Sequence, residues 1–351
     1  MKYVEIYEDL KTQILRRVIA PNDAVPSEKA LTIKYNVSRI TAKRALNELA
    51  KEGLIYRIQG RGSFVKEHGN LTNKQLLLVL PFSGNQDLGN YVAGIQDVLK
   101  DTTWKLLSIT NEEFFTLTIE QLKQNYAGAI YYPQNLHEDI PRLLNIYLAK
   151  FPLVLLDQTI AHSIIPSVVS DNVNGGYLAT KHLLKNNRKK IAFYGATNFM
   201  QDFTGSTADR FAGYIKALRK YQVKHFDPIN LYLKLRQITD NDLGNFIRES
   251  KIDAILAEND VTAFRLLNLL EKNHISIPQE VALMGFDNLP ITELANPQLS
   301  SIGQDFNKLG ASAVNLLLRQ INDPDLLFDK QVVVDVKLIK RKSTKRSQEW
   351  I

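Results

Sequence analysis

The segment from Val25 to Val65 limits the fold more than any other part of this chain. It has apolar residues at helical spacing in two stretches, followed by two short extended stretches around a pair of glycines. Ser27 and Ser38 stand just before the helical stretches, where a side-chain oxygen can accept a free backbone N–H of the first turn. The predicted elements are helices over 28–35 and 39–52 and a hairpin of 54–58 with 63–65. Helix, helix and glycine-tipped hairpin in this order predict a winged helix–turn–helix, an α+β fold.

A further helix is expected before this segment, over residues 3–19, because apolar residues recur there at every fourth position. These residues are Ile6, Leu10, Ile14 and Val18. The helix over 39–52 has an expected buried face and an outward polar stripe. The buried face is Ala42, Ala45, Leu46 and Leu49, and the stripe is Arg39, Lys43, Asn47 and Lys51. Gly53 is expected to end this helix, since glycine readily adopts the left-handed conformation found there.

The positive charge is concentrated in the same part of the chain. The whole sequence has a formal net charge of +7, and residues 1–66 hold 13 Lys and Arg against 7 Asp and Glu. The remaining residues hold 31 against 30. A basic head on a nearly neutral body indicates that the head binds nucleic acid. A solvated charged surface without a partner is the other interpretation.

Composition excludes several classes of protein. The chain has no cysteine, which excludes disulfides, thiolate metal sites and thiol catalysis. The six histidines have no metal-site spacing, and no phosphate-binding loop, dinucleotide fingerprint or nucleophile elbow is present. No apolar run is long enough to cross a membrane, and the N-terminus lacks the apolar core of a signal peptide. We therefore expect a cytoplasmic protein that is not an enzyme, with no catalytic residue, metal or cofactor.

A length of 351 residues requires more than one domain, and the sequence changes character after residue 66. From 74 to 340, short apolar runs alternate with amphipathic helical stretches, which predicts an α/β body with two parallel sheets. The runs are 76–80, 106–109, 129–132, 153–156, 191–194, 254–256 and 281–284, and the helical stretches include 90–100, 174–186, 208–220, 261–272 and 307–319. Residues 67–73 are polar and are expected to form a linker, and residues 341–351 a basic, disordered tail. The expected units are therefore 1–66, 67–73, 74–340 and 341–351.

The chemistry of the head suits a DNA groove. A recognition helix needs polar and cationic side chains near its N-terminus. These are Ser38, Arg39, Thr41, Lys43 and the flanking Arg44. The two hydroxyls and the helix N-terminus can hold a phosphate, and Arg39 can pair with a guanine edge, which gives about 1–3 kcal/mol of discrimination. Glycines in the hairpin would let the backbone approach the duplex, with Arg61 as the cation at its tip.

These residues resemble the winged helix–turn–helix of the GntR family over residues 2–66. The shared motifs are Pro26-Ser27-Glu28, Val37-Ser38-Arg39-Ile40-Thr41, Gly53-Leu54-Ile55 and Gly60-Arg61-Gly62-Ser63-Phe64-Val65. The resemblance implies binding to double-stranded operator DNA. The residues it places at the DNA are Lys2, Lys29, Ser38, Arg39, Thr41, Lys43, Gln59, Gly60 and Arg61, to which we add Arg44. A winged helix that docks a protein is the alternative.

The body resembles the effector domain of LacI/GalR-type regulators, which is itself similar to periplasmic sugar-binding proteins. Matching motifs run from end to end and include Val154-Leu155-Leu156-Asp157, Asp209-Arg210-Phe211-Ala212-Gly213-Tyr214, Ala257-Glu258-Asn259-Asp260 and Gly285-Phe286-Asp287-Asn288. A GntR-type head on a LacI-type, two-lobed periplasmic-binding-protein-like body is the architecture of the arabinose repressors of low-GC Gram-positive bacteria. The resemblance implies a homodimeric repressor that releases DNA when a small sugar, L-arabinose as first choice, binds between the lobes.

Six residues are expected to bind this effector. They are Asp87, Asp157, Arg210, Asn259, Asp287 and Phe306. Carboxylates, amides and an arginine fork can bond two neighbouring sugar hydroxyls at once, and an aromatic ring can cover the C–H face. Asp157 follows a strand, where open α/β sheets place ligands, and Asp287 would lie at the hinge between the lobes. Phe306 suits the core equally well.

Other interpretations stay open for several of these residues. Helix capping is the alternative for Asp157, Asn259 and Asp287. Asp171 is expected to hold a turn or a hinge and is not counted as a ligand. The loop from Thr197 to Ala208 has no clear equivalent in the family, so another carbohydrate or a purine is an alternative effector. The competing function is a cytosolic sugar sensor whose head docks a protein partner.

Overall fold

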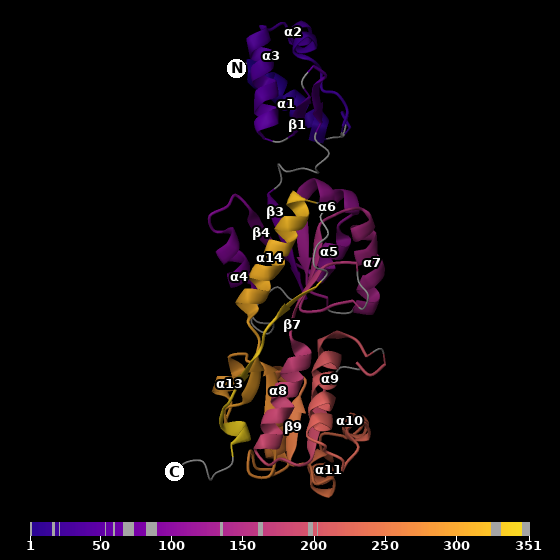
Figure 1. Cartoon of the computed structure of the whole chain (residues 1–351), viewed down its shortest axis with the longest axis vertical. Helices are drawn as coiled ribbons and strands as arrows, with labels where there is room; N and C mark the ends of the chain where they lie inside the picture. The colour runs from indigo at the N-terminus through magenta and orange to yellow at the C-terminus, as the bar shows by residue number, and fades with distance from the viewer. Residues whose placement is uncertain are drawn as a thin grey trace.

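The computed structural model describes residues 2–15, 18–20, 22–52, 54–58, 60–65, 74–81, 90–133, 136–160, 164–195, 199–201, 203–323 and 331–345. Figure 1 shows a small N-terminal head and two α/β lobes. The expected linker at 67–73 lies outside the described residues, as do Gly53, Gln59 and Asp87. No helix within the described ranges is long and apolar enough to span a membrane.

The head is the expected winged helix–turn–helix. Its elements are α1 (Lys2–Leu15), α2 (Glu28–Tyr35), α3 (Arg39–Lys51), β1 (Ile55–Ile58) and β2 (Gly62–Val65). Ser27 Oγ accepts the N–H of Ala30 and Ser38 Oγ that of Thr41, each at 3.2 Å, so both predicted helix caps are present. The core between the helices and the hairpin includes Ile6, Leu10, Leu31, Ala42, Leu46, Leu49 and Val65.

The first helix is shorter than its apolar spacing predicts. It ends at Leu15, and Val18, expected on the buried face, is 70% exposed. The N–H of Val18 bonds to the carbonyl of Gln13, five residues back, so the four-residue spacing that would have buried Val18 is lost. The prediction for this residue is therefore wrong.

The first lobe is built on a six-stranded parallel sheet. Its strands are β3 (Gln75–Leu80), β4 (Lys105–Thr110), β5 (Gly128–Tyr131), β6 (Leu153–Leu156), β7 (Ser167–Ser170) and β12 (Gln331–Val334), in the order β12-β7-β6-β5-β3-β4. Its helices are α4 (Tyr91–Leu99), α5 (Asn111–Thr116), α6 (Ile119–Asn125), α7 (Leu136–Leu148) and α14 (Phe306–Asn322). Leu76 and Leu78 pack with α4 and α14, whereas Leu77 and Val79 pack with α5 to α7. β3 is thus buried on both faces, which explains why its sequence is a continuous apolar run.

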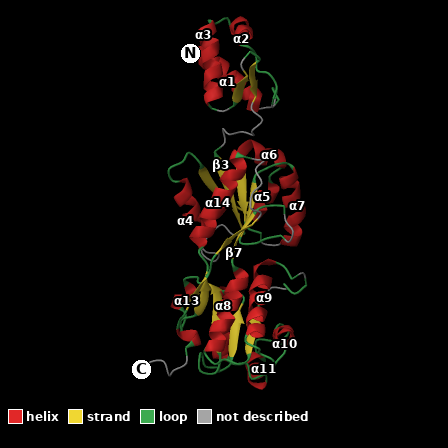
Figure 2. Ribbon diagram, viewed as in Figure 1, coloured by secondary structure: helices red, strands yellow, loops and turns green. Residues whose placement is uncertain are grey.

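The second lobe has the same layered design. Its strands are β8 (Ile191–Tyr194), β9 (Ala254–Ala257), β10 (Ala282–Asp287), β11 (Ser300–Gly303) and β13 (Lys337–Ile339), in the order β13-β11-β10-β9-β8. All pairs are parallel except β11 with β13. Its helices are α8 (Asn172–Lys185), α9 (Gly205–Lys220), α10 (Pro228–Leu235), α11 (Leu243–Glu249), α12 (Asp260–Lys272) and α13 (Ile291–Leu294), with the 3₁₀ helix η1 (Lys342–Thr344). Figure 2 shows helices on both sides of each sheet, so the predicted pair of mainly parallel sheets is confirmed.

The chain passes between the lobes after β7, after β11 and after β12. α14 therefore belongs to the first lobe, although it follows β11 of the second. These passages bring the carboxyl ends of strands from both sheets to one junction, where open α/β sheets place ligands.

The predicted tail begins too early. Ser343 and Thr344 are fully buried, and Ser343 Oγ accepts the N–H of Ser300 at 2.8 Å while donating to the carbonyl of Leu283 at 2.6 Å. Thr344 Oγ1 lies 2.9 Å from Nε2 of His182. The basic composition of this stretch predicts a tail, but its hydroxyls have buried partners, so the prediction is wrong for residues 341–345. Residues 346–351 lie outside the described residues.

Candidate functional site

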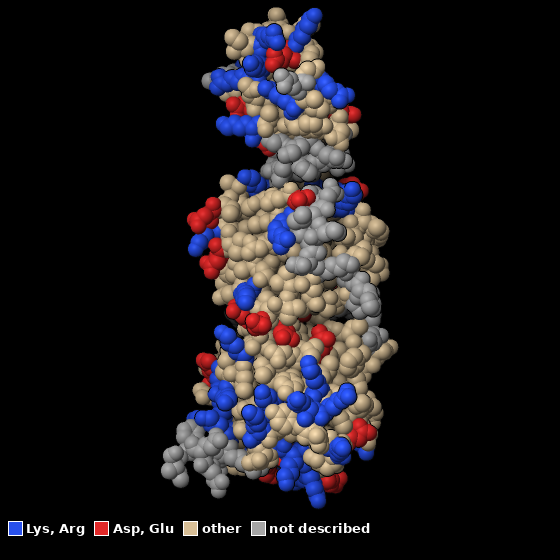
Figure 3. Space-filling model, in the orientation of Figure 1, with Lys and Arg blue, Asp and Glu red and all other residues tan. Residues whose placement is uncertain are grey.

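The outward side of α3 carries the expected cationic surface. Arg39 Nε donates to Glu28 Oε2 at 2.9 Å, although the Arg39 side chain is 82% exposed. This bond is the main reason why the pKa of Glu28 is lowered, and the positive charges of Lys43 and Arg57 lower it further. These three cations therefore lie around one carboxylate. On the face shown in Figure 3, Lys and Arg side chains gather over the head and over the second lobe.

The other described residues expected at the DNA belong to or flank α1, α2, α3 and the hairpin. Ser38 Oγ is 2.8 Å from Thr41 Oγ1 at the N-terminus of α3. The Arg44 guanidinium stacks over the Tyr3 ring, 4.0 Å from its centroid, and so faces the start of α1. Gly60 has a φ of +77° in open space, a conformation that favours glycine at the tip of the hairpin. Lys2, Lys29, Lys43, Arg44, Gly60 and Arg61 are all exposed.

Arg57 on β1 was not among the expected contacts. Its Nη2 donates to Asn47 Oδ1 of α3 at 2.7 Å, which joins the hairpin to the outward stripe of the recognition helix. The alternation of the strand gives no signal for it, because Arg57 stands two positions after the buried Ile55 and so lies on the same face of the strand, although Arg57 itself is exposed.

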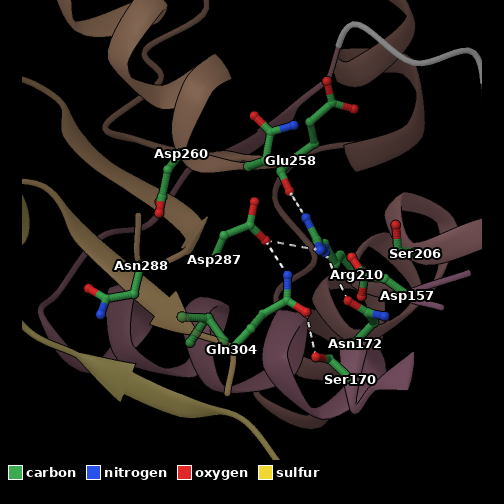
Figure 4. Close-up of polar contacts among 12 residues, drawn as sticks. Asp157, Ser170, Asn172, Ser206, Arg210, Glu258, Asp260, Asp287, Asn288 and Gln304 are labelled. Atoms are coloured by element: carbon green, nitrogen blue, oxygen red, sulfur yellow. Dashed lines mark hydrogen bonds and ion pairs between the residues drawn. The ribbon is translucent and has the colours of Figure 1, made fainter. Parts of the chain in front are cut away.

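A second group of polar residues lies where the lobes meet (Figure 4). Gln158, which follows β6 of the first lobe, donates to Ser206 Oγ of α9 at 3.1 Å and accepts the Ser206 N–H at 3.2 Å. Ser170, at the end of β7, donates to Gln304 Oε1 beyond β11. These contacts bridge the two lobes on either side of Arg210.

Arg210 is the centre of the junction cluster. Its side chain is buried, and it donates from Nε to Asn172 Oδ1 at 2.9 Å and from Nη1 to the carbonyl of Glu258 at 2.6 Å. Nη2 lies 3.2 Å from Asp287 Oδ1, and the guanidinium stacks 3.8 Å from the centroid of the Phe286 ring. These contacts fix the plane of the Arg210 guanidinium.

Two glycines allow α8 and α9 to approach closely behind Arg210. A Cβ atom on Gly176 would lie 1.9 Å from the carbonyl oxygen of Arg210, and one on Gly213 would lie 2.0 Å from that of Val173. No side chain fits at either point. The backbone position of Arg210 is thus set by direct contact between the two helices.

The structure excludes helix capping for two of the expected carboxylates. Asp287 precedes a turn, and α13 begins only after Pro290. Asp287 Oδ1 also accepts from Gln304 Nε2 at 2.6 Å. Asp157 precedes no helix, since β7 is the next element. Its Oδ2 accepts from the Tyr91 hydroxyl at 3.1 Å, while its buried Oδ1 has no hydrogen-bond partner among the described residues.

Burial dominates the electrostatics of this cluster. It raises the pKa of Asp157 to about 7, although the charge of Arg210 acts in the opposite direction. Burial, and then the charge of Asp287, raise the pKa of Asp260 to about 8, and burial also raises the pKa of Asp287. A buried carboxylate prefers the neutral form unless hydrogen bonds or a cation compensate it. Donors from a bound ligand would supply such compensation.

The remaining expected ligands have structural roles as well. Asn259 caps α12, since its Oδ1 accepts the N–H of Thr262 at 2.8 Å. Phe306 begins α14 and packs edge-to-face on Tyr91, with 5.2 Å between ring centroids. Asp171, expected at a turn or a hinge, is the N-cap of α8, since its side chain accepts the N–H of Asn174 at 3.1 Å.

Several residues of the junction cluster were not predicted, and Asp260 is the most deeply buried of them. Its Oδ2 accepts the N–H of Leu289 and its Oδ1 accepts from Ser301 Oγ, both at 2.7 Å. Asp260 thereby holds the turn that follows Asp287. Asn172, Gln304 and Tyr91 were also missed. Asn172 and Gln304 come just after the ends of β7 and β11, and this position was the only indication in the sequence that they belong to the cluster.

The described parts of the chain contain no group of three or more His, Cys, Asp or Glu side chains that could hold a metal ion. The polar residues at the junction are carboxylates, amides, hydroxyls and one arginine. This donor set matches the hydroxyl groups of a polyol.

Two known protein families match separate parts of the chain. Residues 2–65 match the family of bacterial regulatory proteins called gntR, and residues 180–344 match a periplasmic binding protein-like domain. The arabinose metabolism transcriptional repressor of Geobacillus stearothermophilus is 24% identical over 98% of both chains. The HTH-type transcriptional regulator RegA of Clostridium saccharobutylicum is 26% identical and covers 88% of this chain and 91% of its own.

Solved structures show the same fold for the body. The transcription regulator CcpA of Lactococcus lactis has a TM-score of 0.64 and 23% identity, and covers 77% of this chain and 99% of its own. A LacI family regulator from Enterococcus faecium, solved with bound ribose, has a TM-score of 0.62 and 24% identity over 77% of this chain and 98% of its own. The chain thus joins a winged helix that matches the gntR family to a body that has the fold of periplasmic-binding-protein-like domains and of these regulators.

Proposed function

We propose that this protein is a transcriptional repressor that binds operator DNA through the head and releases it when a small sugar binds at the junction of the lobes. The observation that carries the proposal is the buried Oδ1 of Asp157, which lacks a hydrogen-bond partner among the described residues beside an oriented arginine fork. A buried acceptor without a donor is costly, and a ligand hydroxyl would remove that cost.

At the operator, the proposed contacts are Lys2, Lys29, Ser38, Arg39, Thr41, Lys43, Arg44, Gln59, Gly60 and Arg61. The cations around Glu28 support this assignment, and Arg57 joins the same surface. We propose a homodimer in the cytoplasm, because two heads held at a fixed separation can read the two halves of a pseudo-palindromic site.

At the effector site, the proposed ligands are Asp87, Asp157, Arg210, Asn259, Asp287 and Phe306. L-Arabinose is the first choice, because relatives similar over nearly the whole chain are named arabinose metabolism repressors. Asp157 and Asp287 face a single arginine, so the cluster favours neutral polyols over anions. A different neutral carbohydrate is the alternative effector, and a purine fits these carboxylates less well.

The test combines a salt titration with a sugar titration. Binding sites are selected from a library of duplexes with random centres, and the affinity for the best duplex is measured by fluorescence anisotropy from 50 to 200 mM salt, conditions under which about 6–10 phosphate contacts cost 10³–10⁵ in affinity. L-Arabinose should then release the duplex and raise the melting temperature of the protein.

Two outcomes would contradict the proposal. If the affinity for the duplex does not change with salt and shows no sequence preference, a head that docks a protein is favoured. If binding is sequence-specific and weakens steeply with salt, but no pentose, hexose or purine releases the duplex, then the proposal that a sugar regulates the protein is wrong.

A further inference from the structure

Ile40 lies fully outward on the recognition helix. It is 81% exposed, the largest exposed fraction of any large apolar side chain in the described part of the head. It is the second residue of α3, between Arg39 and Thr41. An isoleucine at this point contributes nothing to the hydrophobic core.

The direction of Ile40 follows from helix geometry. An α-helix turns by about 100° per residue, so Ile40 points about 180° away from Leu49, which is fully buried. Lys43 and Arg44 stand three and four positions further on and so share the outward ridge with it. Ile40 is therefore an apolar side chain among cations, on the ridge that would enter a DNA groove.

The major groove offers one apolar group on a base edge, the 5-methyl group of thymine. An isoleucine makes no favourable apolar contact with phosphates, and the edge of guanine forms hydrogen bonds with arginine instead. We propose that Ile40 packs against the 5-methyl group of a thymine beside the guanine that Arg39 contacts, and so selects thymine over cytosine there. This inference rests on the proposed function, since it requires that α3 lies in the major groove.

Ile33 provides a matched control. It is 74% exposed and belongs to the same domain, but it lies on α2. In a helix–turn–helix this helix crosses the DNA backbone and does not read bases. Replacing Ile40 or Ile33 by alanine removes a similar apolar area, but only the substitution of Ile40 should change the affinity for a duplex whose thymine lacks its methyl group.

The experiment deletes the methyl group from the DNA. In the best duplex selected by the full-length protein, each thymine is replaced in turn by 2′-deoxyuridine, and affinities are measured by anisotropy at constant salt. At one thymine in each half-site we expect wild-type affinity to fall about fourfold, which corresponds to about 0.8 kcal/mol for one buried methyl-sized group. Cytosine at that position should bind more weakly, and 5-methylcytosine should restore part of the loss.

The protein variants complete a double-mutant cycle. Ile40→Ala should weaken binding to the parent duplex and lose the sensitivity to deoxyuridine, Ile40→Val should keep most of it, and Ile33→Ala should keep all of it. Far-UV circular dichroism confirms that each variant is folded.

The inference is overturned if no thymine responds to loss of its methyl group, or if Ile40→Ala keeps the response. Either result leaves the proposed function intact as long as binding stays sequence-specific and salt-dependent. A protein that selects no sequence at all overturns both.

Discussion

At the scale of single residues, Asp157 combines three features that disfavour folding. It is buried, its φ is +59°, and its Oδ1 has no partner among the described residues. A non-glycine residue in the left-handed region costs about 1–3 kcal/mol. Costs of this kind persist where the surrounding structure holds a site ready for a ligand. Asp287, with a φ of +111°, shows the same backbone strain and is partly buried.

The raised pKa of Asp157 gives a testable dependence of stability on pH. Its ordinary value is 3.8 and its folded value about 7, so the folded state binds more protons between these values. Wild-type stability therefore falls as pH rises through this window, by about 1.4 kcal/mol per unit of pKa difference. Asp157→Asn cannot titrate, so urea unfolding should show the variant gaining stability relative to wild type from pH 4 to pH 8.

The same substitution should weaken sugar binding, because it replaces an acceptor oxygen of the proposed site. Isothermal titration with L-arabinose at pH 7 measures this loss, which we expect to be at least tenfold. Parallel pH profiles for wild type and variant would show that Asp157 does not titrate in this window, whatever the sugar affinity.

At the scale of elements, the sequence predicts best where one local pattern decides the structure. β3 and β6 are continuous apolar runs, and their bounds agree with prediction to within one residue. β7 and β11 were missed, because their serines interrupt the apolar pattern. Ser300 of β11 is nonetheless buried, since its hydroxyl bonds to Thr344, forty-four positions later. A partner so distant leaves no trace in a local pattern.

The candidate site was predictable only in part for the same reason. Arg210 and Asp287 carry recognisable motifs, and the structure brings them together. Asn172 and Gln304 complete the cluster from elements on either side of the passages between the lobes. Amide side chains are common in all proteins, so the sequence does not mark these two residues. Only the topology of the chain brings them into contact with Arg210 and Asp287.

Two truncations test the corrected C-terminus. Ending the chain after Lys345 keeps the buried hydroxyls of Ser343 and Thr344, so the melting temperature should stay unchanged. Ending it after Lys340 removes them together with Arg341, which bonds to the carbonyl of Leu299 and to Asn288. At about 1 kcal/mol for each net hydrogen bond lost, the melting temperature should fall by at least 5 °C. Equal melting temperatures for both truncations would mean that this segment does not stabilise the lobe.

At the scale of the whole molecule, the junction is the place where a ligand can alter how the lobes are arranged. Gln158 and Ser206 join the lobes there directly, and the passages after β7, β11 and β12 join them covalently. A sugar changes operator affinity only if it binds more tightly to the arrangement that binds DNA less well. The proposed function therefore requires a coupling free energy between two separate sites.

Such coupling is reciprocal, which gives the last prediction. If saturating L-arabinose weakens operator binding by some factor, saturating operator must weaken L-arabinose binding by the same factor, expected to be about 5–150-fold. Anisotropy measures the first and calorimetry the second. Arg39→Ala should lose specific DNA binding with unchanged sugar affinity, and Arg210→Ala should bind DNA that the sugar no longer releases. Because linkage holds for any mechanism at equilibrium, the two factors in the wild-type protein must agree, and a common factor of one would mean that sugar and DNA do not influence each other and would contradict the proposed release.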